Sequence, residues 1–221
     1  MLEAAQQALF KLGAEDPASI RVVLIGAAGA IGAAYARLLA QASKNLVLVS
    51  PDLQKLAELQ RSIQEQTPGA EIVVAAQPGK SLENCDLIVI AASVAGQSVL
   101  EIARCKPGAV ICDLACPPAI YPAEAALRPD VLVIESADLR SFGKRITDED
   151  IAVKRTLAEK LRHNPVYCES IKQEAAQKLA QIRVKRLPRA GAWQQWGLPL
   201  AGLAGLVGLI GLLIRLNRRR R

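Results

Sequence analysis

The sequence predicts an α/β fold in which helices cover a doubly wound parallel sheet. Short runs rich in Val, Ile and Leu alternate with segments of helical periodicity along residues 20–140. The first run, residues 21–25, leads through a glycine-rich turn straight into an Ala-rich helical segment. The chain is 51% hydrophobic but only 3% aromatic, a composition that suits a buried sheet of aliphatic residues.

The predicted elements follow one another in strand–helix order. Strands are expected at 21–26, 46–50, 71–76, 87–92, 109–114 and 131–134. Helices are expected between them at 30–42, 52–66 and about 96–104. Right-handed crossovers between parallel strands place them in the order 3-2-1-4-5-6, with a ligand over the carboxyl ends of strands one and four.

Helical segments flank this sheet domain, which is assigned to residues 20–140. Residues 1–19 hold a leading helix, and 141–187 form a helical extension with one helix beginning at Thr147 and another over about 166–186. The leading helix has an apolar face formed by Leu2, Ala5, Leu9 and Leu12. The last helix of the extension has an apolar face formed by Cys168, Ile171, Ala175, Leu179 and Ile182.

The turn after the first strand has the spacing of a phosphate-binding corner. Gly26, Gly29 and Gly32 recur every three residues at the junction of strand and helix. The first glycine allows a sharp turn, the second lets backbone N–H groups approach a pyrophosphate, and the third lets the helix pack closely on the sheet. The helix N-terminus adds unpaired N–H donors and a partial positive charge. The pattern predicts dinucleotide binding in a Rossmann-type fold, and the alternative is a turn with a purely structural role.

The net charge of +7 belongs to the C-terminal region rather than to the sheet domain. Residues 183–221 hold nine of the 28 Lys and Arg residues and no acid, so the remainder has 19 basic and 21 acidic residues. The body has no basic patch interleaved with aromatic residues, so nucleic acid is not expected as a partner. The five cysteines form no Cys-x-x-Cys pair and His163 is the single histidine, so no metal site and no disulfide framework are predicted.

Residues 198–214 predict a single transmembrane helix. These 17 residues carry no charge, and Trp193 and Trp196 stand ahead of them where an interfacial aromatic belt would lie. An arginine cluster closes the far end. Residues 188–221 are therefore assigned as a C-terminal membrane anchor with a basic tail, in which 198–214 contact membrane lipid.

Two properties of this anchor depend on its surroundings. Gly197, Ala201 and Gly205 recur every four residues, so this face either packs against a second copy of the helix or faces lipid. Basic residues flank both ends of the segment, so the positive-inside rule does not orient it. Because nucleotide cofactors are cytosolic, the globular domain is expected to face the cytoplasm.

Four segments of the chain resemble the NAD(P)-binding domain of the shikimate dehydrogenase-like group. They are IGAAGAIG at 25–32, DLIVIAAS at 86–93, KPGAVICDLACPP at 106–118 and RPDVLVIES at 128–136. Over about residues 1–140 the chain looks most like the cyanobacterial long-chain acyl-acyl-carrier-protein reductases and related predicted dehydrogenases. The resemblance implies an oxidoreductase domain with NADP or NAD as cofactor.

The resemblance also implies which residues lie against the cofactor. Those implied at the pyrophosphate are Gly26, Ala28, Gly29, Ala30, Ile31 and Gly32. Those implied near the nicotinamide are Ala92 and Ser93. After the second strand the family commonly has an arginine for the 2′-phosphate of NADP, and Pro51 stands in that position. Ser50 could bond a ribose hydroxyl or a phosphate, and Asp52 could take the acidic role of NAD sites, or both could merely cap the next helix.

The resemblance leaves two classes of function open. The reductases use a cysteine near the C-terminal region to take the acyl group as a thioester, and Cys168 is the residue in that position. Cys168 also falls on an apolar helix face, as a buried structural cysteine would. One reading is a membrane-anchored NAD(P)-dependent oxidoreductase acting on a lipophilic or carrier-bound substrate. The other is a non-catalytic NAD(P)-binding sensor or recruitment module, because the substrate half of a shikimate dehydrogenase has no counterpart in the sequence.

Overall fold

The computed structural model describes residues 19–92, 99–116, 118–135 and 148–186. The apolar positions of the predicted leading helix, Ser93, Thr147 and the predicted anchor at 198–214 lie outside the described residues. The chain divides after Ala180 into two compact units; the sheet lies in the first, and the last described helix, residues 165–186, runs across the division. Within the described ranges, no helix is both long and apolar enough to cross a membrane.

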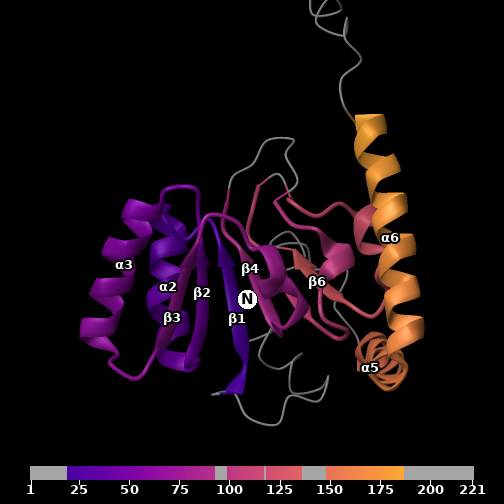
Figure 1. Ribbon diagram of the computed structural model, residues 1–221, viewed down its shortest axis with the longest axis horizontal. Coiled ribbons are helices and arrows are strands. Elements are labelled where there is room, and N and C mark those ends of the chain that lie inside the picture. Colours follow the sequence, from indigo (N-terminus) through magenta and orange to yellow (C-terminus); the bar gives the residue numbers. More distant parts are fainter. Residues whose placement is uncertain (1–18, 93–98, 117, 136–147, 187–221) are drawn as a thin grey trace, which may run out of the picture. The chain divides into compact units, whose positions relative to one another are not determined.

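A six-stranded parallel sheet forms the centre of the fold, in the predicted order β3-β2-β1-β4-β5-β6 (Figure 1). Its strands are β1 (Arg21–Ile25), β2 (Asn45–Val49), β3 (Glu71–Ala75), β4 (Leu87–Ile90), β5 (Val110–Asp113) and β6 (Leu132–Glu135). β4 and β5 are buried along their whole length, which explains why their sequences are continuous apolar runs. The carboxyl ends of all strands meet at one edge, and the strand order reverses between β1 and β4.

Helices α2 (Ala30–Ala42) and α3 (Leu53–Gln66) cover one face of the sheet. α2 spans the residues predicted for it, and α3 begins one residue late because Asp52 is its N-cap. Their buried positions recur at helical spacing and are Gly32, Ala36, Leu39 and Ala40 on α2, and Leu56, Leu59 and Ile63 on α3. Small side chains on α2 allow this helix to lie close to β1 and β2.

The opposite face of the sheet is covered unevenly. Its central strands pack against two 3-10 turns, η2 (Gly79–Glu83) and η3 (Ile102–Arg104), and against Leu179 of α6 (Pro165–Arg186). On the outer strands of the same face, Val47 is half-buried and Val73 is exposed. This half of the sheet therefore presents apolar side chains that the described helices do not cover.

The helix predicted at about 96–104 is wrong over its described part. The chain forms only the 3-10 turn η3, and Glu101 before it has a non-helical backbone with φ −93° and ψ 88°. Ile102 and Cys105 are both buried, and 3-10 geometry places side chains three residues apart on the same side. Cys105 is already extended, and Lys106 precedes Pro107, where helical backbone is disfavoured. The burial of Ile102 and Cys105 favours the 3-10 turn, and Pro107 disfavours helical backbone just after it.

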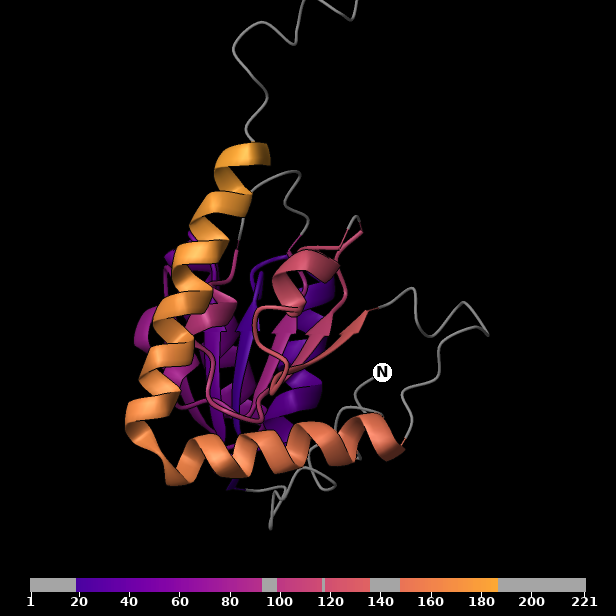
Figure 2. The same cartoon turned by 90° about the vertical axis from the view of Figure 1, so that its right-hand side faces the viewer.

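Helices α5 (Asp148–His163) and α6 form the helical extension (Figure 2). The Asn164-Pro165 pair ends one helix and begins the next. The side-chain oxygen of Asn164 accepts the N–H of Tyr167 at 3.1 Å, and Pro165 occupies the first helical position, where its missing N–H is harmless. The predicted apolar face of α6 is confirmed, with Cys168, Ala175 and Leu179 buried and Ile171 and Ile182 half-buried.

Helix α5 lies at the amino ends of β5 and β6. The Lys154 ammonium donates to the carbonyls of Pro129 and Val131 at 2.9 and 3.0 Å, just before β6. Burial lowers the pKa of Lys154, although nearby carboxylates oppose the shift. The Arg162 guanidinium donates to the carbonyl of Pro107 at 3.3 Å, before β5. Two cationic side chains therefore fasten this helix to the edge opposite the strands' carboxyl ends.

A buried ion pair fixes the turn that leads into β6. Arg128 donates to the two carboxylate oxygens of Asp130 at 2.8 and 2.7 Å, and both side chains are fully buried. A third guanidinium nitrogen reaches the carbonyl of Ala103 at 2.7 Å. Burial lowers the pKa of Arg128, but the hydrogen bonds and charge of Asp130 outweigh this and hold that pKa above its ordinary value. The pair joins η3 to the entry of β6.

Candidate functional site

The predicted phosphate-binding corner lies where β1 passes into α2. Gly26 follows the last residue of β1 and has φ +84°, a conformation that side-chain-bearing residues rarely adopt. The N–H groups of Gly26 and Ala27 both donate to the carbonyl of Val49, at 2.8 and 3.2 Å. The turn is therefore held against the carboxyl end of β2 as well as that of β1.

Two of the three glycines are required by packing. A Cβ built on Gly26 would lie 2.7 Å from the backbone nitrogen of Ala92, which follows β4. A Cβ built on Gly32 would overlap the carbonyl oxygen of Gly26 and lie 2.8 Å from the Cα of Ala27. The glycine turn, the first turn of α2 and the end of β4 thus approach one another more closely than any side chain allows.

The third glycine is different. Gly29 is the N-cap residue of α2, with φ −77° and ψ 162°, a backbone conformation open to any residue. A Cβ built there would meet only the carbonyl oxygen of Gly26, at an ordinary contact distance of 3.4 Å. The fold itself therefore does not require glycine at this position.

The N-terminus of α2 faces outward and carries no acidic side chain. No side chain caps it, and its first turn contains no acid. Ala30 is exposed and Ile31 is 62% exposed, while Ala28 is half-buried. Among the residues that the structure describes, the N–H groups of Ala30, Ile31 and Gly32 meet no hydrogen-bond acceptor. The helix end can therefore donate to an external anion, and the predicted pyrophosphate residues are brought together here.

The residues predicted at the ribose lie at the carboxyl end of β2. The Ser50 side chain is buried, and its oxygen accepts the N–H of Asp52 at 3.3 Å. One Asp52 oxygen accepts the N–H of Lys55 at 3.1 Å, and the other pairs with the Lys55 ammonium at 3.1 Å. The hydrogen bond from the Lys55 backbone, helped by that ammonium, lowers the pKa of Asp52. The capping role weighed for Asp52 is thus observed, and its role toward a ribose remains a prediction.

Asp113 is a site-forming residue that the sequence reasoning did not single out. It ends β5 at the same edge as Gly26 and Ala92, and its side chain is buried. Its carboxylate accepts the N–H groups of Ala115, Ala119 and Ile120 at 3.0, 2.6 and 3.0 Å. These bonds fix the described parts of the loop after β5. The signal in the sequence is an acid as the last residue of a buried apolar strand.

The predicted catalytic residue, Cys168, is not brought to this edge. It is buried in the first turn of α6 and lies near the Arg128 guanidinium. Arg128 precedes β6 and therefore lies at the amino ends of the strands. A parallel strand of four or five residues is about 13–17 Å long, so roughly that distance separates the two edges. The burial fits a structural cysteine, and the catalytic role of Cys168 stays a prediction.

The other cysteines divide into buried and exposed thiols. Burial raises the pKa of Cys85 far above its ordinary value, and raises the pKa of both Cys105 and Cys112 to about 12. These three are inert side chains of the core. Cys116, in the loop that Asp113 fixes, is the one exposed thiol among the five. The described residues contain no group of three or more His, Cys, Asp or Glu side chains that could hold a metal ion.

Comparison with known proteins found likeness at the level of fold only. No family model matches the chain, and a comparison with curated proteins gave no match.

The ligand-free 5-ketofructose reductase of Gluconobacter sp. strain CHM43 is 18% identical with a TM-score of 0.46, over 69% of this chain and 61% of that one. The Δ1-pyrroline-2-carboxylate reductase of Thermococcus litoralis, solved with NADH and L-proline, is 15% identical with a TM-score of 0.40, over 51% and 34%. The yhdH oxidoreductase of Salmonella enterica, solved with NADP, is 16% identical with a TM-score of 0.42, over 83% and 56%. The matches thus span between a third and two thirds of the length of these proteins.

Proposed function

We propose that the corner between β1 and α2 binds the pyrophosphate of NADP or NAD. The observation that carries the proposal is the contrast among the three glycines. Packing requires glycine at positions 26 and 32, whereas position 29 has room for a Cβ and needs only a residue that suits an N-cap. A side chain at position 29 would project in front of the free N–H groups of α2, where a pyrophosphate would lie. A ligand at this place would favour glycine over the polar side chains that also suit an N-cap.

The rest of the edge fits a dinucleotide. The corner lies at the point where the strand order reverses, which is where open parallel sheets bind ligands. The Ser50 and Asp52 side chains at the end of β2 lie on the side where the adenosine ribose would be, and Ala92 lies on the nicotinamide side. Ala92 has no side chain large enough to block a ring. Bound there, the cofactor would supply or accept a hydride.

We further propose that the chain is an oxidoreductase held at a membrane by residues 198–214, with its globular domain facing the cytoplasm and a lipophilic or carrier-bound substrate. The support is the sequence resemblance to acyl-carrier-protein reductases and the uncharged segment of 17 residues. An anchor would hold the globular domain near a substrate that resides in or beside the bilayer.

A second function is favoured by the position of Cys168. This thiol is buried near Arg128, which precedes β6, and an acyl group held on it would lie far from a nicotinamide beside Ala92. A chain that binds NAD(P) without reacting would act as a cofactor sensor or recruitment module at a membrane. The same cofactor site serves both functions, so cofactor binding is tested first.

The test is titration of the purified full chain, kept soluble in detergent micelles, with NADPH and with NADH. Saturable binding of either supports the proposal, and no binding of either at millimolar concentration overturns both functions. Asp52→Asn then tests cofactor choice, since asparagine caps α3 as well as aspartate does but carries no charge. If Asp52 contacts the ribose, this variant loses affinity for NADH and gains it for NADPH. If Asp52 serves only as a cap, both affinities stay unchanged.

Turnover distinguishes the enzyme from the sensor. The full chain is incubated with the cofactor that it binds and a long-chain acyl thioester, and oxidation of the reduced nicotinamide is followed by absorbance. Oxidation in step with aldehyde release supports the oxidoreductase, and binding without oxidation supports the sensor. Cys168→Ala should leave any turnover unchanged, because the thiol lies at the far edge of the sheet.

A further inference from the structure

An apolar row crosses the whole sheet on the face opposite α2 and α3. Strand register places one residue of each strand in this row, in the order Val73, Val47, Val23, Ile88, Ile111 and Val133. Val23, Ile88 and Ile111 are fully buried, Val47 is half-buried and Val73 is 58% exposed. The row is therefore one continuous core layer whose outer end is open to solvent.

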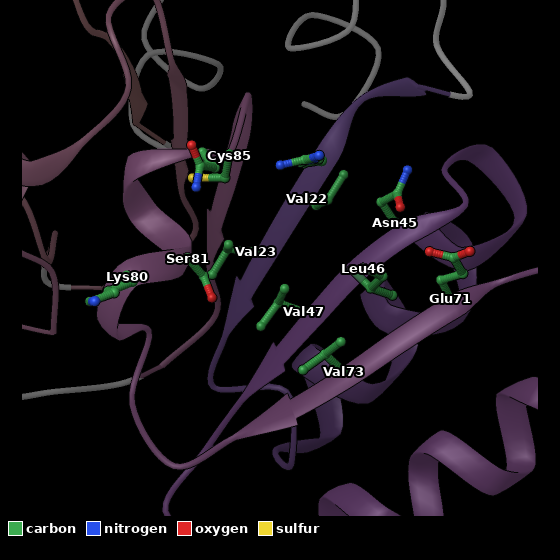
Figure 3. A pocket seen from close by; sticks show the side chains of 12 residues that line it. Val22, Val23, Asn45, Leu46, Val47, Glu71, Val73, Lys80, Ser81 and Cys85 are labelled. Atoms are coloured by element: carbon green, nitrogen blue, oxygen red, sulfur yellow. The ribbon is translucent and has the colours of Figure 1, made fainter.

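The open end of the row lies in a pocket of about 380 Å³. Figure 3 shows Val23, Val47 and Val73 side by side on three neighbouring strands. Ser81 and Cys85, in and after η2, form one wall of the pocket. The rim is polar and consists of Arg21, Asn45, Glu71, Lys80 and Asn84. An apolar floor inside a polar rim is typical of a surface that another element covers.

The connection between β3 and β4 explains why the floor is open. Residues 76–86 make this crossover with the 3-10 turn η2, which covers β1 and β4 but not the outer strands. Parallel sheets are stable when both faces are covered, and α2 and α3 already cover the other face. Among the described elements, none lies over Val47 and Val73 on the open side. A covering element is therefore expected from elsewhere.

We propose that residues 1–12 of this chain form an amphipathic helix that packs on Val47 and Val73. The described chain begins at Ser19, two residues before Arg21, which lines the pocket. Leu2, Leu9 and the other apolar positions of the segment share one helical face. A helix of 12 residues is about 18 Å long, enough to cross three strands that are about 4.8 Å apart.

The link and the charges agree with this occupant. Residues 13–18 can span about 20 Å when extended, whereas β1 and β3 are about 10 Å apart. So short a link gives the segment a high effective concentration over the pocket, which a separate molecule would lack. The link holds two acids, Glu15 and Asp16, and no basic residue, and the pocket rim carries Arg21 and Lys80 against Glu71. The net charges of link and rim are therefore opposite. This pocket lies toward the amino edge of the sheet, and its lining residues are not those of the proposed cofactor site.

Disulfide trapping in the full chain tests the proposal. Leu9→Cys and Val73→Cys are introduced together in a Cys116→Ser background, which removes the exposed native thiol. Mild oxidation should give a disulfide within one chain, identified by mass spectrometry of the linked peptides. The matched control is Gln7→Cys with Val73→Cys, because Gln7 lies on the opposite side of the predicted helix. The control pair should form the same bond at least about tenfold more slowly, although its link has nearly the same length.

A second measurement uses no disulfide. The thiol introduced by Val73→Cys should be alkylated about tenfold faster when Leu9→Glu is added, because a charge cannot be buried on the valine floor. Gln7→Glu should leave the rate unchanged. Equal trapping by both cysteine pairs, or an alkylation rate insensitive to Leu9→Glu, overturns the proposal. A disulfide between two chains also overturns it, because it identifies a second copy as the cover.

Discussion

The contrast between Gly29 and Gly32 gives the sharpest test of the cofactor site. Both glycines lie at the start of α2, six residues or fewer from Gly26, and each can be replaced by alanine. At Gly32 the added Cβ would clash with backbone atoms of the protein. At Gly29 the added Cβ fits within the protein but would clash with a bound pyrophosphate. Gly32→Ala is therefore expected to lower the stability of the fold. Gly29→Ala is expected to lower cofactor affinity and to leave stability nearly unchanged.

For Gly32→Ala the clash is with backbone atoms. The new Cβ would overlap the Gly26 carbonyl oxygen and lie 2.8 Å from the Cα of Ala27, whereas carbon atoms pack at about 3.5–4.0 Å. Overpacking of this kind costs about 1–3 kcal/mol, and more when rigid backbone must move. Alanine regains about 1 kcal/mol of helix propensity. A net loss of about 2 kcal/mol is expected, which lowers the Tm by about 4–8 °C in a unit of this size.

For Gly29→Ala the two effects on stability nearly cancel. Alanine is a poorer N-cap than glycine by about 0.5–1 kcal/mol, and it removes about as much conformational entropy from the unfolded chain. The Tm should stay within about 2 °C of the parent. The Cβ would hold a pyrophosphate away from the N–H groups of α2, so cofactor affinity should fall at least about tenfold, or 1.4 kcal/mol.

Thermal unfolding and cofactor titration of the same preparations measure both quantities. Unchanged affinity in Gly29→Ala would refute the placement of a pyrophosphate at this corner. A loss of stability equal to that of Gly32→Ala would refute the claim that packing does not require this glycine. The parent protein and Gly32→Ala serve as the two reference points.

Other predictions concern the core and the thiols. Asp130→Asn leaves Arg128 buried without its charged partner, so the free energy of unfolding in urea should fall by about 3–5 kcal/mol. The three buried thiols with a raised pKa keep their protons in the folded state when the unfolded chain loses them above about pH 9. Stability should therefore be full below pH 9 and fall as the pH rises above it, with a smaller fall in Cys112→Ala and the same fall in Cys116→Ala. In the native protein, a thiol reagent should label Cys116 quickly and the other four cysteines slowly. Asp113→Asn turns an accepting oxygen into a donor facing backbone N–H groups, so the loop after β5 should become sensitive to proteolysis, which a thermolysin digest would show.

The features that the sequence predicts well are those with a local cause. The strand order follows from alternating apolar runs and crossovers, and the bounds of α2 follow from the glycine turn before it and the polar residues after it. The 3-10 turn at Ile102 was not predictable, because it depends on the burial of two side chains by distant elements. The Arg128 contact was not predictable either, since its carbonyl partner lies 25 residues earlier in the chain.

In the candidate site, too, the residues with a local cause are predictable from the sequence and those that depend on distant contacts are not. Residues of the glycine turn were identified because spacing alone places them together. Asp113 was missed because its role depends on N–H groups that return to it from as far as seven residues along the chain. The family resemblance makes Cys168 a candidate nucleophile, but its position along the chain does not determine at which edge of the sheet α6 begins.

The carbonyl of Val49 ties the glycine turn to the stability of the outer sheet. It accepts two N–H groups of that turn, and the next residue, Ser50, donates its N–H to the carbonyl of Ala75 at the end of β3. When the less covered outer strands open by fluctuation, the acceptor that shapes the turn moves with them. A ligand that needs the turn intact must therefore slow hydrogen exchange along β2 and β3, far beyond the atoms that it touches. Hydrogen exchange at the amides of β2 and β3 would then measure ligand binding at the glycine turn.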